Sequence, residues 1–489
     1  MPAANARKAI MMIWDGLRPD YVSPALTPRL HALAGEGVRF ADSHAVFPTF
    51  TRCNSATLST GYYPARHGIP GNRFAAQAIE LGRIFNAAER EPLEDLRAHR
   101  GRLLHVDTVG DQLAAVGRTA AVLGTGSPGA ALLQHPDVAL RGHLMLHPTM
   151  WEGVDPAQFQ KNKGPWPEKT RPNTEQNAYF TSLITEYLLP ERSHSYISYW
   201  HTDPDHTAHA MGVGHPNTLK SIRDADNNLG MILDALDRLG LRGETDVIVV
   251  SDHGFSTITD ALPVRTALLE AGVIDDAASV DVLDADGGIY VRDHHAGTVQ
   301  RVVDVLHRMP SVGSIFTGAH GNPALPGTDD LAVVGQGGEL SPDILISGDW
   351  DSEENEHGYR GRAYGGAVRR EGFIATHGSA SPWDIKNTLI MSGPSFKRGL
   401  VSEAPAGNVD VAPTLRHTLG LPATPADGRV LREALVGGPD PSTLSVHREV
   451  SETASPDGRF RQRVHRSFVD GKGGTATAAH VDYVEADHA

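Results

Sequence analysis

Short apolar runs that alternate with helix-like segments constrain the fold of this chain more than any other feature. Ala9–Trp14 (AIMMIW), Ser195–Trp200 (SYISYW) and Asp246–Val250 (DVIVV) have the pattern of strands that are buried on both faces. Asn217–Leu239 instead places apolar residues three and four positions apart, as a helix with one buried face does. The alternation predicts an α/β fold in which helices cover both faces of a mostly parallel central sheet.

Residues 261–370 interrupt this alternation. They are rich in glycine and aspartate and carry only short strand signals, such as GGIYVRD and DILISGDW. We therefore predict a smaller cap subdomain in this segment, inserted into a core formed by residues 1–260 and 371–440. Residues 441–489 are predicted to form a C-terminal extension, whose role the sequence does not define.

Charge and cysteine content narrow the class of protein. The 489-residue chain has 44 basic and 59 acidic residues, a net charge of -15, which argues against binding of a nucleic acid polymer because such binding needs a basic face. The net charge is compatible with a small anionic substrate, since a bound metal ion makes the local electrostatic potential positive. The single cysteine excludes an intramolecular disulfide.

The N-terminal apolar run bears on location. Ala9–Trp14 is too short to span a membrane, and no small-residue cleavage site accompanies it. We therefore predict a cytoplasmic protein without a membrane partner. The sequence does not define the oligomeric state and is compatible with a homo-oligomer.

Acidic residues and histidines follow several of the predicted strands. The sites of this kind are Asp15, Asp205 with His209, Asp252-His253, and His377. In open α/β folds ligands bind at the carboxyl ends of the strands, so we expect most of these side chains to converge. Asp205 and His209 are four residues apart, which puts both on one face of a helix if Pro204 begins it. Carboxylate oxygens and imidazole nitrogens suit a pair of zinc-like ions, which about 4 Å apart would clamp the attacking and leaving oxygens of a phosphoryl transfer.

Each of these signals is ambiguous by itself. An isolated Asp-His-Gly is commonly a surface turn, and an Asp-x-x-x-His pair on a helix commonly lies on a solvated face. An aspartate after a strand commonly caps a helix. Their joint occurrence in one chain, with a loop rich in threonine and serine near the first of them, favours a metal centre.

The sequence resembles the alkaline phosphatase superfamily, and within it the type I phosphodiesterase/nucleotide pyrophosphatase family. The resemblance is carried by Asp15-Gly16, Phe47–Asn72, Pro204–His209 (PDHTAH), Ser251–Phe255 (SDHGF), Thr376–Gly378 (THG) and the later NVDVAPTL. These segments occur in the family's order between residues 8 and 421. The resemblance implies an alkaline-phosphatase-like three-layer α/β/α sandwich and a metal-dependent hydrolase of phosphoric esters.

The resemblance also implies a role for each site residue. It implies two Zn²⁺ ions per chain, other divalent metals being alternatives, the first held by Asp15, Asp252 and His253 and the second by Asp205, His209 and His377. Thr51 corresponds to the nucleophile, which also contacts the first ion, and Asn72 to a donor of a hydrogen bond to a phosphate oxygen. The reaction would pass through a phosphothreonine intermediate, since zinc contact makes the threonine alkoxide available.

Thr51 and Cys53 compete for the role of nucleophile in the segment FPTFTRCNSATLSTG. Related sulfatases and phosphonate monoester hydrolases place a modified cysteine nine residues before a Thr-Gly pair. That pair is Thr60-Gly61 here, so the aligned position is Thr51, and Cys53 is two residues out of register. A sulfatase is therefore disfavoured. We predict that Cys53 is a small buried residue and that a helix begins at Ser55, after the loop TFTRCN.

Arg52 and Trp200 are the candidate substrate-binding residues. Nucleotide pyrophosphatases usually have an aromatic residue directly after the nucleophile, where this chain has Arg52. Trp200 lies five residues before Asp205, where the family often has a pocket aromatic. We therefore expect one stacking wall and one cation, which can bind a second phosphate or a carboxylate through two hydrogen bonds.

These observations predict a two-zinc phosphodiesterase of the nucleotide pyrophosphatase type, with a small phosphodiester or nucleotide-like substrate. A C–P hydrolase resembling phosphonoacetate hydrolase is the nearest alternative, although the segment after Asn72 lacks the lysines that would bind its carboxylate. A phosphomonoesterase would need further positive groups, for which Arg52 is a candidate. A non-catalytic binding protein is disfavoured because the ligand positions and Thr51 are intact, and a structural zinc site because such sites are rich in cysteine.

Overall fold

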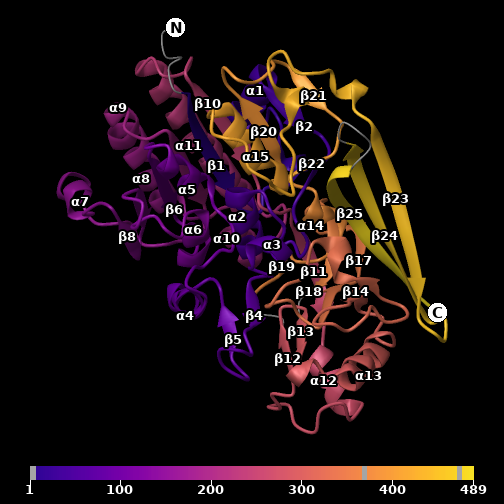
Figure 1. The fold of residues 1–489 in the computed structure, drawn as a ribbon. Coiled ribbons are helices and arrows are strands. Elements are labelled where there is room, and N and C mark those ends of the chain that lie inside the picture. Colours follow the sequence, from indigo (N-terminus) through magenta and orange to yellow (C-terminus); the bar gives the residue numbers. More distant parts are fainter. Residues whose placement is uncertain (1–6, 366–371, 471–475) are drawn as a thin grey trace.

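A large mixed sheet forms the centre of the protein, whose computed structural model describes residues 7–365, 372–470 and 476–489 (Figure 1). The strand order is β21 (Leu400–Ser402), β2 (Val38–Phe40), β20 (Leu389–Ser392), β10 (Thr245–Val250), β1 (Lys8–Trp14), β9 (Tyr196–His201), β6 (Ala120–Gly124), β7 (Leu144–His147) and β8 (Met150–Glu152). All of these strands run in one direction except β20 and β8. The sheet is therefore mostly parallel, as the apolar runs predicted.

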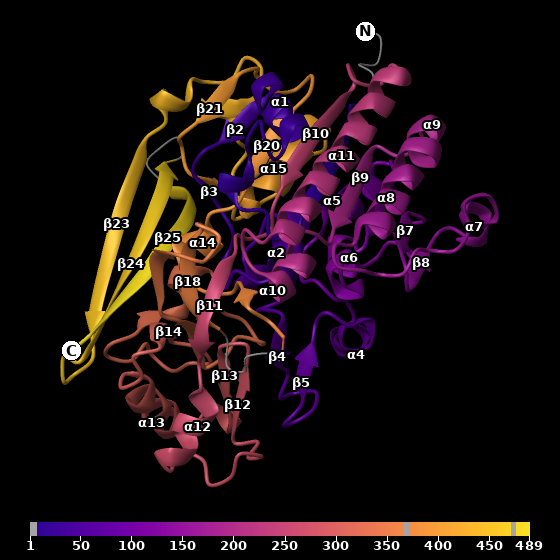
Figure 2. The same ribbon diagram turned by 180° about the vertical axis from the view of Figure 1, so that it is seen from behind.

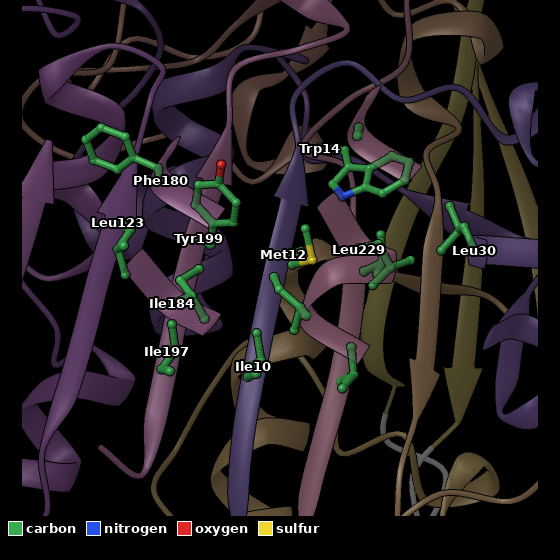
Figure 3. Packing of buried hydrophobic residues seen from close by; sticks show 14 of the residues in the cluster. Ile10, Met12, Trp14, Leu30, Leu123, Phe180, Ile184, Ile197, Tyr199 and Leu229 are labelled. Carbon is green, nitrogen blue, oxygen red and sulfur yellow. The ribbon is translucent and has the colours of Figure 1, made fainter. Parts of the chain in front are cut away.

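Helices cover both faces of this sheet. Ile10, Met12 and Trp14 of β1 pack into a core on one face (Figure 3), and the residues between them pack into a separate core on the other. The first face carries α1 (Pro28–Glu36), α8 (Thr174–Leu183) and α11 (Pro216–Arg238), and Figure 2 shows α8 and α11 lying across it. The second face carries α2 (Thr51–Thr60), α5 (Val109–Ala115), α6 (Pro128–Gln134) and α15 (Asn408–Thr418). Successive residues of β1 thus point alternately into the two cores, so the sheet and the helices on its two faces form three layers.

Two smaller sheets lie beside the core in the lower part of Figure 1. One has the order β17 (Trp350–Glu354), β18 (Arg360–Gly365), β11 (Ser256–Ala261) and β19 (Ala375–Thr376). The other has the order β12 (Val282–Ala285), β13 (Gly288–Val291), β16 (Ile344–Gly348), β14 (Val312–Thr317) and β15 (Asp329–Asp330). The latter, called the cap sheet below, packs against α12 (Val264–Glu270) and α13 (Ala296–Leu306). The predicted domain boundary between residues 370 and 371 lies outside the described residues.

The C-terminal residues form an antiparallel sheet of β23 (Val446–Ala454), β24 (Phe460–Asp470) and β25 (Ala476–His488), drawn in yellow in Figure 1. This sheet contacts both the core and the cap sheet. The backbone N–H of Val484 donates to the carbonyl oxygen of Ala380 at 2.9 Å, and Nε2 of His44 lies 2.8 Å from Asp482 Oδ1. On the cap side, the side-chain amide of Gln462 makes hydrogen bonds of 2.8 and 3.0 Å to the backbone of Ile315.

Shorter elements connect these parts. Further helices are α3 (Pro64–His67), α4 (Arg90–Arg100), α7 (Ala157–Lys163), α9 (Leu189–Glu191), α10 (Asp205–Met211) and α14 (Pro382–Ile385). Further strands pair as β3 (Ser43–His44) with β22 (Ala406–Gly407), and β4 (Arg73–Ala75) with β5 (Ile84–Asn86). Among the described residues, no helix combines the length and the apolar character that crossing a lipid bilayer requires.

Candidate active site

The adjacent parallel strands β1 and β10 end beside each other and bring Asp15, Asp252 and His253 together at one edge of the central sheet. All three residues are buried, and their ligand atoms lie within 4.8 Å of one another. Nε2 of His253 lies 3.4 Å from Asp15 Oδ1 and 3.2 Å from Asp252 Oδ2. Nδ1 of the same ring donates to the carbonyl oxygen of Gly254 at 2.8 Å, so Nε2 is the nitrogen that can bind a metal.

The second ligand group comes from α10 and from the chain that follows β19. α10 begins at Asp205, and His209 lies one turn later, with its Nε2 3.1 Å from Asp205 Oδ1. The same carboxylate oxygen lies 3.3 Å from Nε2 of His377. Both rings donate through Nδ1 to backbone carbonyl oxygens, His209 to Ala375 at 2.9 Å and His377 to Thr49 at 2.7 Å. The four-residue spacing therefore places Asp205 and His209 on one helix face, as expected.

The two groups lie next to each other. The rings of His253 and His377 are stacked, with centroids 3.5 Å apart and planes 11° apart. Ligand atoms of Asp205, His253 and His377 also lie within 4.8 Å of one another, so His253 belongs to both groups. The backbone N–H of Asp205 donates to the carbonyl oxygen of Asp15 at 2.9 Å, which joins α10 to the end of β1. Two ions would therefore be neighbours in this site.

Three carboxylate oxygens of the site lack a hydrogen-bond donor within the described ranges of the chain, and a bound cation would take the place of that donor. Asp15 Oδ1, Asp205 Oδ1 and Asp252 Oδ2 are buried, and no donor within the described part of the chain makes a hydrogen bond to them. Such atoms are rare in folded proteins, because a buried polar atom without a partner costs free energy. The donor set of carboxylate oxygens and imidazole nitrogens fits Zn²⁺ or a similar divalent ion.

The pKa shifts of Asp15 and His377 also suit a metal site. Burial, with the carboxylates of Asp205 and Asp252 nearby, raises the pKa of Asp15 well above its usual range. Burial and the neighbouring His253 ring lower the pKa of His377 to about 4, which keeps that imidazole neutral. A neutral imidazole binds metal, and a cation would let the clustered carboxyl groups ionise together.

Thr51 is the first residue of α2, so the prediction of a loop up to Asn54 and a helix from Ser55 is wrong at this end. The residues of α2 are buried almost throughout, and α6 and α15 pack against them, so tertiary packing stabilises a helix with many poor helix formers. Thr51 Oγ1 lies 3.4 Å from His253 Nε2 and faces a cavity of about 280 Å³. The nucleophile candidate thus lies at a helix N-terminus, where free N–H groups favour an anion.

Asn72 and Arg52 line the same cavity. Oδ1 of Asn72 accepts a hydrogen bond from the backbone N–H of Arg52 at 3.0 Å. The amide nitrogen of Asn72 is therefore the part of the side chain that can donate to a ligand. The structure places Asn72 in the cavity that Thr51 lines, where the resemblance implies it.

Trp200 does not form a wall of the cavity, which corrects its interpretation as a stacking residue. Its side chain is 1% exposed and belongs to the core on the α5 and α6 face of the sheet. The indole N–H donates to Asp15 Oδ2 at 2.9 Å, reaching it from the adjacent strand β9. Trp200 therefore orients a metal-ligand carboxylate, and the five-residue spacing to Asp205 did not reveal which way the ring points.

Cys53 is buried, as predicted. Its thiol donates to the carbonyl oxygen of Pro48 at 3.0 Å. Burial raises the pKa of this thiol to about 12, so it stays protonated. Neither its position nor its protonation suits a nucleophile.

The sequence analysis did not identify several of the cavity residues, among them Lys169, Arg171 and Phe373. Lys169 Nζ donates to the carbonyl oxygen of Gly126 at 3.2 Å, from the connection between α7 and α8. The Phe373 ring stacks on His209, with centroids 4.3 Å and planes 19° apart. In the sequence, only the short stretch EKTR indicated Lys169 and Arg171. Segments that are far apart in the chain line this cavity, so no local pattern marks these two residues.

Comparisons with known proteins agree with this geometry. The family profile described as type I phosphodiesterase/nucleotide pyrophosphatase matches residues 9–366. Human ectonucleotide pyrophosphatase/phosphodiesterase family member 5 is 21% identical over 438 residues, which cover 87% of this chain and 76% of the relative. Mouse family member 7 is 23% identical over 462 residues, which cover 92% of both chains.

A solved structure of murine ectonucleotide pyrophosphatase/phosphodiesterase 5, described as an inactive threonine-to-alanine variant in complex with AMP, has a similar fold. It superposes with a TM-score of 0.61 at 18% identity, over 88% of this chain and 100% of that one. The alkaline-phosphatase-like fold and the resemblance inferred from the motifs are confirmed.

Proposed function

Since the chain belongs to the type I phosphodiesterase/nucleotide pyrophosphatase family, we propose that it is a phosphodiesterase that holds two zinc ions and uses Thr51 as its nucleophile. One observation carries the proposal: three carboxylate oxygens in the groups that share His253, the neighbour of Thr51, are buried without a hydrogen-bond donor among the described residues. A protein that only binds a neutral ligand has no use for such a concentration of negative charge. A centre for divalent cations requires it.

The residues divide between two ions. Asp15, Asp252 and His253 would hold one ion, and Asp205, His209 and His377 the other. Bound ions would supply Lewis acid stabilisation of the attacking and leaving oxygens, and they lower the pKa of a contacting hydroxyl. The metal is zinc in this proposal because imidazole nitrogen makes up half of the ligand set.

Thr51 would attack the phosphorus in line with the leaving group. An O–P bond forms to Oγ1 while the bond to the leaving oxygen breaks. This gives a phosphothreonine that still carries the other ester group of the diester, and the leaving oxygen departs as the free alcohol or phosphate product with the proton of the Thr51 hydroxyl. Water then cleaves the O–P bond and restores the hydroxyl. The amide nitrogen of Asn72 and the backbone N–H of Thr51 at the start of α2 would donate to the non-bridging oxygens as charge grows on them.

The basic residues that line the cavity suggest what the substrate carries. Arg52, Lys169 and Arg171 line the cavity, although the whole chain has a net charge of -15. A local basic wall in an acidic protein attracts anions to that place. We propose a small nucleotide-like diester or pyrophosphate with an anionic group beyond the scissile bond, in line with the relative solved with AMP.

Lys169 also supports a second candidate, a C–P hydrolase. The segment directly after Asn72 has no lysine for a substrate carboxylate, but Lys169 reaches the cavity from a distant loop. A phosphonate with a carboxylate would fit the same cations. A phosphomonoesterase would likewise use Arg52, and the cytoplasmic location stays a prediction from the sequence.

Hydrolysis assays on matched variants test the proposal. With zinc, the wild type should cleave bis-p-nitrophenyl phosphate faster than it releases phosphate from phosphonoacetate. Thr51→Ala should lower kcat by roughly a thousandfold or more, while Cys53→Ala keeps near-normal turnover. Mass spectrometry of acid-quenched enzyme should find the phosphoryl group on the peptide that contains Thr51. Full turnover by Thr51→Ala would refute the assignment of the nucleophile, and preferred cleavage of phosphonoacetate would favour the C–P hydrolase.

A further inference from the structure

The cap sheet brings two histidines and an aspartate to one of its edges, and none of the three lines the cavity at Thr51. β16 lies between β13 and β14 and is antiparallel to both. The C-terminal ends of β13 and β14 therefore meet the start of β16 at the same edge. His294 lies in the turn after β13, His320 lies in the loop after β14, and Asp343 directly precedes β16.

These three side chains are in contact. Nδ1 of His294 lies 2.8 Å from Asp343 Oδ1. The rings of His294 and His320 are stacked, with centroids 3.6 Å and planes 14° apart. One ligand atom from each of the three residues lies within 4.8 Å of the other two. In a tetrahedral zinc site with bonds of about 2.0–2.1 Å, the ligand atoms lie roughly 3.3 Å apart, so small side-chain movements would complete the geometry.

Further hydrogen bonds orient the cluster. Asp343 is 3% exposed, and its Oδ2 accepts from the backbone N–H of Val291 at 2.7 Å. Nε2 of His320 donates to the carbonyl oxygen of Ser341 at 2.7 Å, which leaves Nδ1 of that ring as its ligand atom. Metal-binding histidines in proteins are held in the same way, by a carbonyl or carboxylate on the nitrogen that does not bind the ion.

The cluster is open on one side. His294 lines a cavity of about 100 Å³ together with Tyr290, Glu339 and Ser341. His99, near the end of α4 in the core, lines the same cavity. A water molecule in this space can supply a fourth ligand, and the opening gives an ion a way in.

We propose that His294, His320 and Asp343 form a further metal site, which takes Zn²⁺ or a similar ion such as Co²⁺. Two imidazoles and one carboxylate suit late first-row metals and do not suit Mg²⁺ or Ca²⁺, which prefer all-oxygen shells. A neutral imidazole binds through one nitrogen and keeps its proton on the other, so the proton that His294 Nδ1 shares with Asp343 moves to Nε2 when an ion takes its place. The ion joins the ends of three strands and takes no part in phosphoryl transfer.

Counting metal ions in matched variants tests the site. Asparagine is the suitable replacement, because His294 and His320 have φ angles of 51° and 54° and asparagine tolerates this left-handed conformation. Full-length wild type, His294→Asn and His320→Asn are loaded with Zn²⁺, passed through gel filtration and analysed for zinc by mass spectrometry. We expect each variant to hold one ion fewer than the wild type and to hydrolyse diesters at the wild-type rate.

A spectrum and a control variant keep the result unambiguous. With Co²⁺, the wild type should show visible absorption from tetrahedral cobalt that is weaker in His320→Asn. His377→Asn should also lose ions, but it should lose activity with them. The count difference between wild type and His320→Asn does not depend on how many ions the centre at Thr51 holds, so the two proposals fail separately. Equal zinc counts and equal cobalt spectra in wild type and both cap variants would overturn the proposed site.

Discussion

The centre at Thr51 and the cluster at the edge of the cap sheet share one structural feature but differ in the hydrogen-bond partners of their carboxylate oxygens. Each has a stacked pair of imidazoles, with centroids 3.5 Å apart in the centre and 3.6 Å apart in the cap. In the centre, three carboxylate oxygens have no hydrogen-bond donor among the residues that the structure describes. In the cap, both oxygens of Asp343 have partners, Val291 N–H and His294 Nδ1.

The difference separates a site that needs ions from one that can accept an ion. A carboxylate with all its partners is stable with or without a metal, whereas clustered carboxylates without donors are stable only beside a cation. The centre also has a hydroxyl at a helix N-terminus and a basic wall, and neither is a feature of the cap cluster. The residue types in a cluster therefore do not identify a catalytic site by themselves. The hydrogen-bond partners of the carboxylate oxygens distinguish the two clusters.

The largest effect should come from removing one carboxylate at each place. Asp205→Asn removes the negative charge of the carboxylate that lies beside both His209 and His377, so we expect kcat for bis-p-nitrophenyl phosphate to fall by roughly a thousandfold or more. Asp343→Asn should leave kcat within about twofold of the wild type, because Asp343 does not line the cavity at Thr51. Steady-state kinetics at saturating zinc measure both. Comparable losses in the two variants would break the distinction between the sites.

An intermediate effect should follow from Trp200→Phe. The phenyl ring fills most of the buried space but removes the N–H that donates to Asp15 Oδ2 at 2.9 Å. Loss of such a ligand-orienting hydrogen bond typically costs about 10- to 100-fold in metal affinity or activity. Zinc titration of the activity would show the weaker binding, and excess zinc should restore part of the rate. If Trp200→Phe instead raised KM for nucleotide substrates at unchanged zinc affinity, the ring would be a substrate wall after all.

The smallest effect should come from the basic wall. Lys169 is exposed, so Lys169→Ala should lower kcat/KM by roughly fivefold, equivalent to about 1 kcal/mol, for a substrate with a second anionic group. The same variant should cleave bis-p-nitrophenyl phosphate at the wild-type rate, since that diester has no further charge. Added salt should shrink the difference between wild type and variant. An equal loss on both substrates would assign Lys169 to the ions or to the fold.

The ligand positions were predictable from the sequence because local patterns encode them. Asp15 and Asp252 follow continuous apolar runs, and the carboxyl ends of adjacent parallel strands must meet at one edge. The start of α2 was not predictable, because contacts with distant helices stabilise a sequence of threonines and serines that alone favours a loop. Lys169 reaches the cavity from a loop without a motif, and nothing in the sequence shows that Trp200 points inward.

The C-terminal sheet has a consequence for how the protein unfolds. Apolar residues of β24 and β25 complete cores that also contain residues of the cap sheet, and Asp482 and Val484 hold the same strands to the core. An inserted part that is held to its host only at two chain crossings commonly melts separately, but here the C-terminal sheet adds to the direct packing of cap residues such as Leu283 and Tyr290 against the core residue Phe74. Core and cap should therefore unfold in one cooperative transition, and a chain that ends at residue 440 should unfold at a lower temperature.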